Sequence, residues 1–179
     1  MDEHGLVTPQ LPQQCPAEEL HACFPPSHFD VVHMRNALDH SFDPLLGIER
    51  MLRVVRPGGW VLLRHARNEG VPGQFRNGLH QWSFDVADAG HDETLRSASA
   101  SSSVEHSQSA SRVSFVIWNP ELRVDVTRYL LDSGLAAEVR TELHDHPSED
   151  APPDEKFVWV DIRRPTAEEA SAIRARLAA

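Results

Sequence analysis

The amino-acid sequence predicts an α/β fold with a mainly parallel sheet and an antiparallel hairpin near the C-terminus. Two observations indicate this class. Residues 29–66 follow the pattern strand, helix, strand, and the two strands of such a unit lie parallel in one sheet. Residues 136–163 contain two apolar segments joined by an acidic, proline-containing loop, and this arrangement allows an antiparallel hairpin at one edge of the sheet.

Composition limits the class of protein and its partners. The chain has 179 residues, of which 40% are hydrophobic, and this is enough for one domain with a core. Its 17 basic and 27 acidic residues give a net charge of −10, which repels phosphate backbones and anionic lipids, so we expect neither nucleic acid nor a membrane as partner. No apolar run is long enough to span a membrane or to act as a signal peptide, and we expect a cytoplasmic protein. Its two cysteines, Cys15 and Cys23, are then expected to be reduced thiols.

The N-terminal part of the chain is expected to be extended. Five prolines in residues 1–28 exclude a long helix, although one short helical turn over residues 17–22 is compatible with them. The first strong element is the segment Phe29–Met34, which is apolar and β-branched. This composition is typical of a strand that is buried on both faces.

A helix and a second strand follow. Asp43 and Pro44 form an N-cap followed by proline at the first helical position. The apolar residues then recur with helical spacing, and Pro57-Gly58-Gly59 is expected to end the helix. The segment 60–66 is predicted to be a second buried strand. The apolar face of the helix consists of Leu45, Ile48, Leu52 and Val55.

The remaining chain alternates irregular and regular segments. Residues 67–90 contain four glycines and predict a long structured loop, and residues 97–112, half of them serine, predict a flexible insertion. A strand is expected over 113–118 and a helix over 124–133. Thr166 and Glu169 form a capping box that opens a C-terminal helix ending near Leu177.

The segment from Cys15 to Gly70 resembles a known family. Its motifs are Ala17-Glu18, Phe29-Asp30-Val31-Val32, Asn36-Ala37-Leu38-Asp39-His40, Asp43-Pro44, and Arg53-Val54-Val55-Arg56-Pro57-Gly58-Gly59. In this order and at this spacing they resemble the second part of a class I S-adenosylmethionine-dependent methyltransferase domain of the small-molecule type. The resemblance implies a partial Rossmann-like fold, S-adenosylmethionine as cofactor, and methyl transfer to a small molecule or saccharide.

The glycine-rich cofactor loop of that family has no counterpart in this sequence. The loop is written Gly-x-Gly-x-Gly, because backbone must approach the cofactor closely. No two of the nine glycines here are separated by a single residue. The fourteen residues before Cys15 are also too few for two strands and two helices, so the sequence is expected to hold only the C-terminal portion of the domain. We expect weak or no binding of S-adenosylmethionine to this chain alone.

Several consequences follow for organisation and activity. The chain divides into an extended segment (1–28), a partial methyltransferase domain (29–163) and a C-terminal helix (164–179). The strand that begins at Phe29 is expected to lie at an uncovered edge and to favour self-association. Whether the chain is an active enzyme stays open, and a non-catalytic truncated remnant or an assembly partner is the first alternative.

Candidate cofactor residues lie before and after the first strand. By resemblance, Glu18 corresponds to the acid beside the adenine ring, and an ordinary solvated glutamate is its alternative reading. Arg35, Asn36 and Ala37 follow a strand of the parallel sheet, where ligands of α/β proteins bind. Asn36 could orient the methionine end of the cofactor or a substrate amine. Capping of a turn or of the next helix is the alternative for Asn36 and the favoured interpretation of Asp39.

Candidate catalytic and substrate residues are histidines and their neighbours. His40 could act as a general base on an acceptor hydroxyl, and His65 ends the second strand at the same rim of the sheet. Packed or surface histidines are the alternative at both positions. Asn68, His80 and Trp82 could line the substrate site, although Trp82 is more often an anchor that pins a loop.

A metal site is considered at His144-Asp145-His146. In a strand the two histidines would share one face, as a divalent metal requires. No third or fourth ligand with regular spacing is present, so a solvated acidic loop is favoured and no metal ligand is assigned. A metal-binding acidic-histidine module is the second alternative function.

Overall fold

The structure is a computed structural model that describes residues 13–76, 79–88, 113–145 and 155–178. The predicted serine-rich insertion, 97–112, lies outside these residues, as does most of the acidic loop 144–155. None of the described helices is long and apolar enough to cross a membrane.

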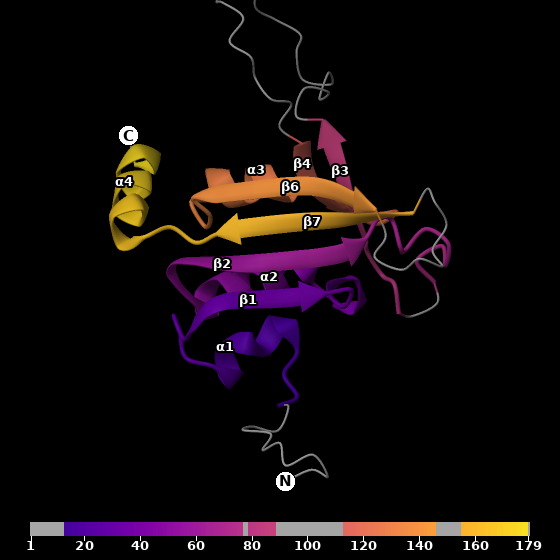
Figure 1. Ribbon diagram of the computed structural model, residues 1–179, viewed down its shortest axis with the longest axis horizontal. Helices are drawn as coiled ribbons and strands as arrows, with labels where there is room; N and C mark the ends of the chain where they lie inside the picture. Colours follow the sequence, from indigo (N-terminus) through magenta and orange to yellow (C-terminus); the bar gives the residue numbers. More distant parts are fainter. Residues whose placement is uncertain (1–12, 77–78, 89–112, 146–154, 179) are drawn as a thin grey trace, which may run out of the picture.

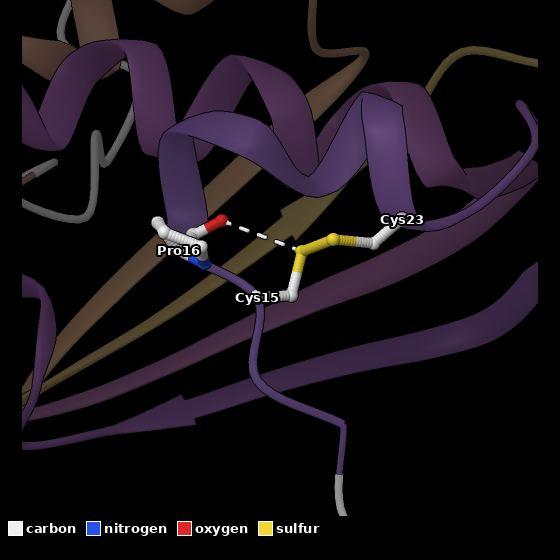
Figure 2. Close-up of a disulfide and its surroundings, with 3 residues drawn as sticks. All are labelled: Cys15, Pro16 and Cys23. Atoms are coloured by element: carbon white, nitrogen blue, oxygen red, sulfur yellow. Dashed lines mark hydrogen bonds between the residues drawn. A yellow bond between two sulfur atoms is a disulfide. The ribbon is translucent and has the colours of Figure 1, made fainter.

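Two short helical elements near the N-terminus are joined by a disulfide. The 3-10 helix η1 (Ala17–Glu19) and the helix α1 (Leu20–Cys23) confirm the predicted helical turn. This turn brings the Cα atoms of Cys15 and Cys23 to 6.4 Å, and the two residues form a disulfide (Figure 2). The prediction of reduced thiols was therefore wrong, because the helical turn folds the chain back over the eight residues that separate the cysteines.

The predicted strand–helix–strand unit is confirmed as β1 (Phe29–Arg35), α2 (Pro44–Val54) and β2 (Val55–Ala66), and the short 3-10 helix η2 (Leu38–His40) lies between β1 and α2. Asp43 caps α2, since its Oδ1 accepts a hydrogen bond of 2.9 Å from the backbone N–H of Leu46. The helix ends at Val54, and Pro57, Gly58 and Gly59 lie inside β2 rather than in a turn. Only glycine fits at position 59, because a Cβ there would lie 2.6 Å from the backbone oxygen of Asp30.

The main sheet has four strands in the order β1-β2-β7-β6. β1 and β2 are parallel, and the hairpin strands β6 (Glu138–Asp145) and β7 (Lys156–Arg163) are antiparallel to each other. Because β7 is also antiparallel to β2, the strands β1, β2 and β6 run in one direction and β7 alone is reversed (Figure 1). The predicted α/β class, mainly parallel with an antiparallel C-terminal hairpin, is confirmed.

A second, smaller sheet was not predicted. It contains β3 (Ser83–Asp88), β4 (Val113–Trp118) and β5 (Arg123–Asp125), all antiparallel, and α3 (Val126–Asp132) follows it. β4 was predicted with these bounds, whereas β3 falls within the segment predicted to be a loop. The alternation of Phe84 and Val86 with polar residues was a strand signal, and the nearby glycines obscured it.

The core lies between the helices α2 and α3 and the strands of both sheets, and β1 borders it on one face only. Val31 of β1 is 49% exposed, whereas Val61 of the neighbouring β2 is fully buried. The prediction that β1 is buried on both faces was therefore wrong. Among the described strands β1 pairs with β2 alone, so it forms the edge of the sheet, and self-association through this edge stays a prediction.

The C-terminal helix is attached to β7 by an ion pair. α4 (Ala167–Leu177) begins with the predicted capping box of Thr166 and Glu169. Arg163 donates two hydrogen bonds, of 2.9 and 2.8 Å, to the carboxylate of Glu169. These bonds, together with the Thr166 backbone N–H, hold the pKa of Glu169 down at about 2.

The buried strand residues are expected to dominate stability. Leu63 of β2 is fully buried, whereas Leu143 of β6 is 42% exposed. We expect Leu63→Ala to lower the free energy of unfolding by about 2–5 kcal/mol, because it leaves a cavity in the core. Leu143→Ala is the matched control and should change it by less than about 1 kcal/mol. Urea denaturation of both variants measures the difference, and equal losses would contradict this account of the core.

Candidate functional site

The site lies where the carboxyl ends of β1 and β2 meet the loop before β3. Its centre is Asp39 in η2, which is 1% exposed. The backbone oxygen of Asp39 accepts a hydrogen bond of 3.0 Å from the N–H of Gln81. Its Oδ2 lies 2.5 Å from Nδ1 of His80. A carboxylate only accepts hydrogen bonds, so Nδ1 of His80 carries the proton and donates it.

Three histidines surround the Asp39 carboxylate. Besides His80, His40 places its Nε2 3.3 Å from Oδ2, and His65 places its Nδ1 4.0 Å from Oδ1. The rings of His40 and His80 meet edge to face, with their centroids 4.8 Å apart. The side chain of His40 is 40% exposed and that of His80 23% exposed, so a ligand can reach both rings. The structure therefore brings together three of the histidines that the sequence singled out.

His65 differs from the other two because it is 1% exposed. Burial, and then the charges of His33 and His40, lower the pKa of His65 to about 3. The ring is therefore neutral near pH 7. It packs against Phe84, with ring centroids 4.4 Å apart. The predicted catalytic role of His65 stays a prediction.

Asn36 and Glu69 form the wall of the site between the two strand ends. Asn36 has a φ of +45°, in the left-handed region that asparagine tolerates better than most residues. Its Nδ2 donates to Oε1 of Glu69 at 3.3 Å, and its Oδ1 accepts from the N–H of Ala66 at 3.0 Å. Oε1 of Glu69 also lies 3.9 Å from Nδ1 of His80. Burial, and then the charge of Asp39, raises the pKa of Glu69.

Two of the residues predicted to line a substrate site bind other parts of the protein. Oδ1 of Asn68 accepts a hydrogen bond of 3.0 Å from the indole N–H of Trp118, which joins the end of β2 to the second sheet. Trp82 donates from Nε1 to the backbone oxygen of Ser41 at 3.0 Å. Trp82 thus pins its loop beside η2, and a contact of either side chain with substrate stays a prediction.

The residues at the end of β1 are open to solvent. Arg35 and Ala37 are exposed, and the guanidinium carbon of Arg35 lies 5.9 Å from the ring centroid of Phe157. They flank Asn36 at the same strand end, and their predicted contact with the cofactor stays a prediction.

Glu18 is a buried anchor. It is 5% exposed, and its Oε1 accepts hydrogen bonds from the backbone N–H groups of Phe42 and Asp43, at 3.0 and 3.2 Å. It is therefore not the solvated glutamate that was the alternative reading, and its carboxylate holds the chain that leads into α2. A role beside the adenine ring stays a prediction.

Two residues of the tract considered as a metal site, His144 and Asp145, lie at the end of β6. His144 stacks on Trp159 with ring centroids 3.9 Å apart and lies 3.0 Å from Glu142. Asp145 pairs with Lys156. His146 lies outside the described residues, so the predicted shared face is not tested.

Sequence reasoning missed the centre of the site, Asp39, and its neighbour Glu69. Asp39 was interpreted as a turn cap, but it directly precedes a histidine and follows a strand end. The sequence signal for Asp39 was an acid after a strand, together with His65 at the end of the next strand and His80 in the loop that follows. Chemically, the arrangement offers two things. His80 is oriented by the Asp39 carboxylate, as a general base requires. The carboxylates of Asp39 and Glu69 together favour a positive charge nearby.

Removing the Glu18 carboxylate should destabilise the start of α2. Glu18→Ala leaves two backbone N–H groups without their acceptor, so we expect the free energy of unfolding to fall by about 1–3 kcal/mol. The exposed neighbour Glu19 provides the matched control, and Glu19→Ala should cost less than about 0.5 kcal/mol. Chemical denaturation followed by circular dichroism measures both. A neutral Glu18→Ala would show that this anchor is dispensable.

Part of the chain is similar in sequence to known methyltransferases. A family model described as a methyltransferase domain matches residues 4–63. Methyltransferase str3 of Strobilurus tenacellus is 33% identical over 67 residues, which are 35% of this chain and 24% of that protein. The chain thus spans about a quarter of the length of this curated relative.

Solved methyltransferase structures are more distant. A CurJ carbon methyltransferase has a TM-score of 0.48 and 15% identity over 86% of this chain and 35% of its own. A SAM-dependent methyltransferase from Methanosarcina mazei has a TM-score of 0.45 and 14% identity over 86% and 66%. Residues 4–63 are thus similar in sequence to a methyltransferase domain.

Proposed function

We propose that this chain supplies the acceptor side of S-adenosylmethionine-dependent methyl transfer to a hydroxyl group of a small molecule or saccharide. One observation carries the proposal. The Asp39–His80 pair, with an oxygen–nitrogen distance of 2.5 Å, lies at the carboxyl ends of two parallel strands. Ligands of open α/β sheets bind at this end of the strands.

His80 is the proposed general base. A hydroxyl group that accepts a methyl group must release its proton, and histidine is the side chain that most often takes such a proton. Because Nδ1 of His80 donates to Asp39, the lone pair of the ring is on Nε2. The proton of the acceptor hydroxyl would pass to Nε2, and the Asp39 carboxylate would stabilise the resulting imidazolium. His40, the base predicted from the sequence, lies farther from Asp39 and would line the site.

The charged groups of the site suit the positively charged side of the cofactor. S-adenosylmethionine, when bound, supplies an electrophilic methyl group on a positively charged sulfur. The carboxylates of Asp39 and Glu69 favour a positive charge nearby, and Asn36 holds Glu69 in place. The chain has no Gly-x-Gly pair, so none of its residues is assigned to the ribose or to the methionine carboxylate. Weak cofactor binding by this chain alone is therefore part of the proposal.

A cytoplasmic location of the protein is also a proposal. A cytoplasmic protein fits the absence of a membrane-spanning helix among the described residues. The Cys15–Cys23 disulfide is more typical of an oxidising compartment.

Replacing His80 should remove most of the activity. We expect His80→Gln to lower the rate of methyl transfer by about 10²–10⁴-fold, the usual contribution of a general base. The assay measures transfer from methyl-labelled cofactor at millimolar concentration to a panel of small hydroxyl compounds that includes monosaccharides. His144→Gln is the control, because this histidine lies on β6 against Trp159.

Two outcomes would contradict the proposal. Equal rates for wild type and His80→Gln would exclude His80 as the base. A wild-type chain that transfers no methyl group at millimolar cofactor, to any acceptor of the panel, would favour the non-catalytic remnant or assembly partner.

A further inference from the structure

The side chains around Asp39 also have the arrangement of a metal site. Asp39, His40 and His80 each offer one ligand atom, and these three atoms lie within 4.8 Å of one another. We propose that these residues bind one divalent transition-metal ion of the Zn²⁺ class. A further coordination position would stay open to water or to an acceptor hydroxyl.

The distances are close to those of a tetrahedral site. Bonds of about 2.0–2.2 Å at tetrahedral angles place two ligand atoms about 3.3 Å apart. Oδ2 of Asp39 and Nε2 of His40 are 3.3 Å apart in this structure. Oδ2 of Asp39 and Nδ1 of His80 are 2.5 Å apart, with a proton between them. Binding of the ion through Nδ1 would leave the ring neutral with its proton on Nε2, and would separate the two atoms by a little less than 1 Å.

Buried polar atoms without partners form the second observation. Oδ1 of Asp39, both ring nitrogens of His65 and Oε2 of Glu69 are buried and make no hydrogen bond. Buried polar atoms in folded proteins are nearly always paired, so atoms left over in one cluster indicate a missing ligand. His65 is 1% exposed and directs Nδ1 at Asp39 from 4.0 Å. From there it can support the ligating carboxylate, as groups around metal ligands commonly do.

The kind of metal follows from the ligand set. Two imidazoles and one carboxylate suit Zn²⁺, Co²⁺ or Ni²⁺, whereas Mg²⁺ and Ca²⁺ prefer oxygen ligands alone. Glu69, whose Oε1 is 3.9 Å from Nδ1 of His80, adds a second carboxylate beside the three ligands. A divalent ion would offset the negative charge that Asp39 and Glu69 bring together.

The metal site goes beyond the proposed methyl transfer and does not depend on it. With the ion bound, Nδ1 of His80 would bind the metal instead of donating to Asp39. The ion would then take over the activation of the acceptor, because a bound hydroxyl or water loses its proton more easily. Metal binding is measured without cofactor or acceptor, so failure of one proposal leaves the other testable.

Calorimetry on the full chain tests the inference. The 179-residue protein is treated with chelator, exchanged into chelator-free buffer and titrated with ZnCl₂. Elemental analysis after gel filtration gives the stoichiometry. We expect one Zn²⁺ per chain, no detectable binding of Mg²⁺, and a Kd raised at least about tenfold in both His40→Gln and His80→Gln.

The controls separate this site from other histidines. A His144→Gln/His146→Gln double variant removes the two histidines of the His144-Asp145-His146 tract and should bind Zn²⁺ like wild type. Co²⁺ added to the wild-type chain should give the visible absorption of a four- or five-coordinate ion, a readout that does not depend on whether any variant folds. The inference is overturned by wild-type Zn²⁺ affinity in both single variants. Loss of binding in the double variant, or the absence of stoichiometric Zn²⁺, would also overturn it.

Discussion

A carboxylate that is 1% exposed must be paired or neutralised, because an isolated buried charge is very costly. Asp39 meets this requirement through His80, and the backbone of Asp39 binds Gln81 in the same loop. Two segments that are 41 residues apart in the sequence are thereby held together: η2 after β1, and the loop before β3. The Asp39–His80 pair therefore lies at the centre of the candidate site.

The scaffold around Asp39 places the remaining groups. β1 and β2 are parallel, so the residues that follow them lie at the same end of the sheet, beyond the carboxyl ends of both strands. At this end of the sheet Asn36 adopts a left-handed backbone conformation. Its side chain links the two strand ends through hydrogen bonds with Ala66 and Glu69. Glu18 supports the other side of η2 by holding the chain before α2. Backbone strain and buried hydrogen bonds therefore concentrate at one end of the sheet, as they often do at functional sites.

Local sequence patterns predicted most helices and strands, but they did not predict the contacts between segments that are distant in the sequence. The Asp43–Pro44 cap and the Thr166 capping box are local signals, and both helices begin where these signals place them. β3 was missed because nearby glycines obscured a short alternation. The disulfide and the burial of Asp39 depend on how the chain folds back on itself, which periodicity does not report. His40, His65 and His80 were candidates for separate reasons, and only the fold shows that one carboxylate joins them.

Nitrogen NMR of the imidazole rings in the metal-free chain tests the central role of Asp39 most directly. The structure predicts that His80 carries its proton on Nδ1 and loses this preference in Asp39→Asn. It also predicts that His65, with a pKa lowered to about 3, stays neutral at pH 5, where a histidine with the usual pKa of about 6.5 is mostly charged. A His80 ring protonated on Nε2 alone, together with a His65 ring that titrates near pH 6.5, would contradict the account.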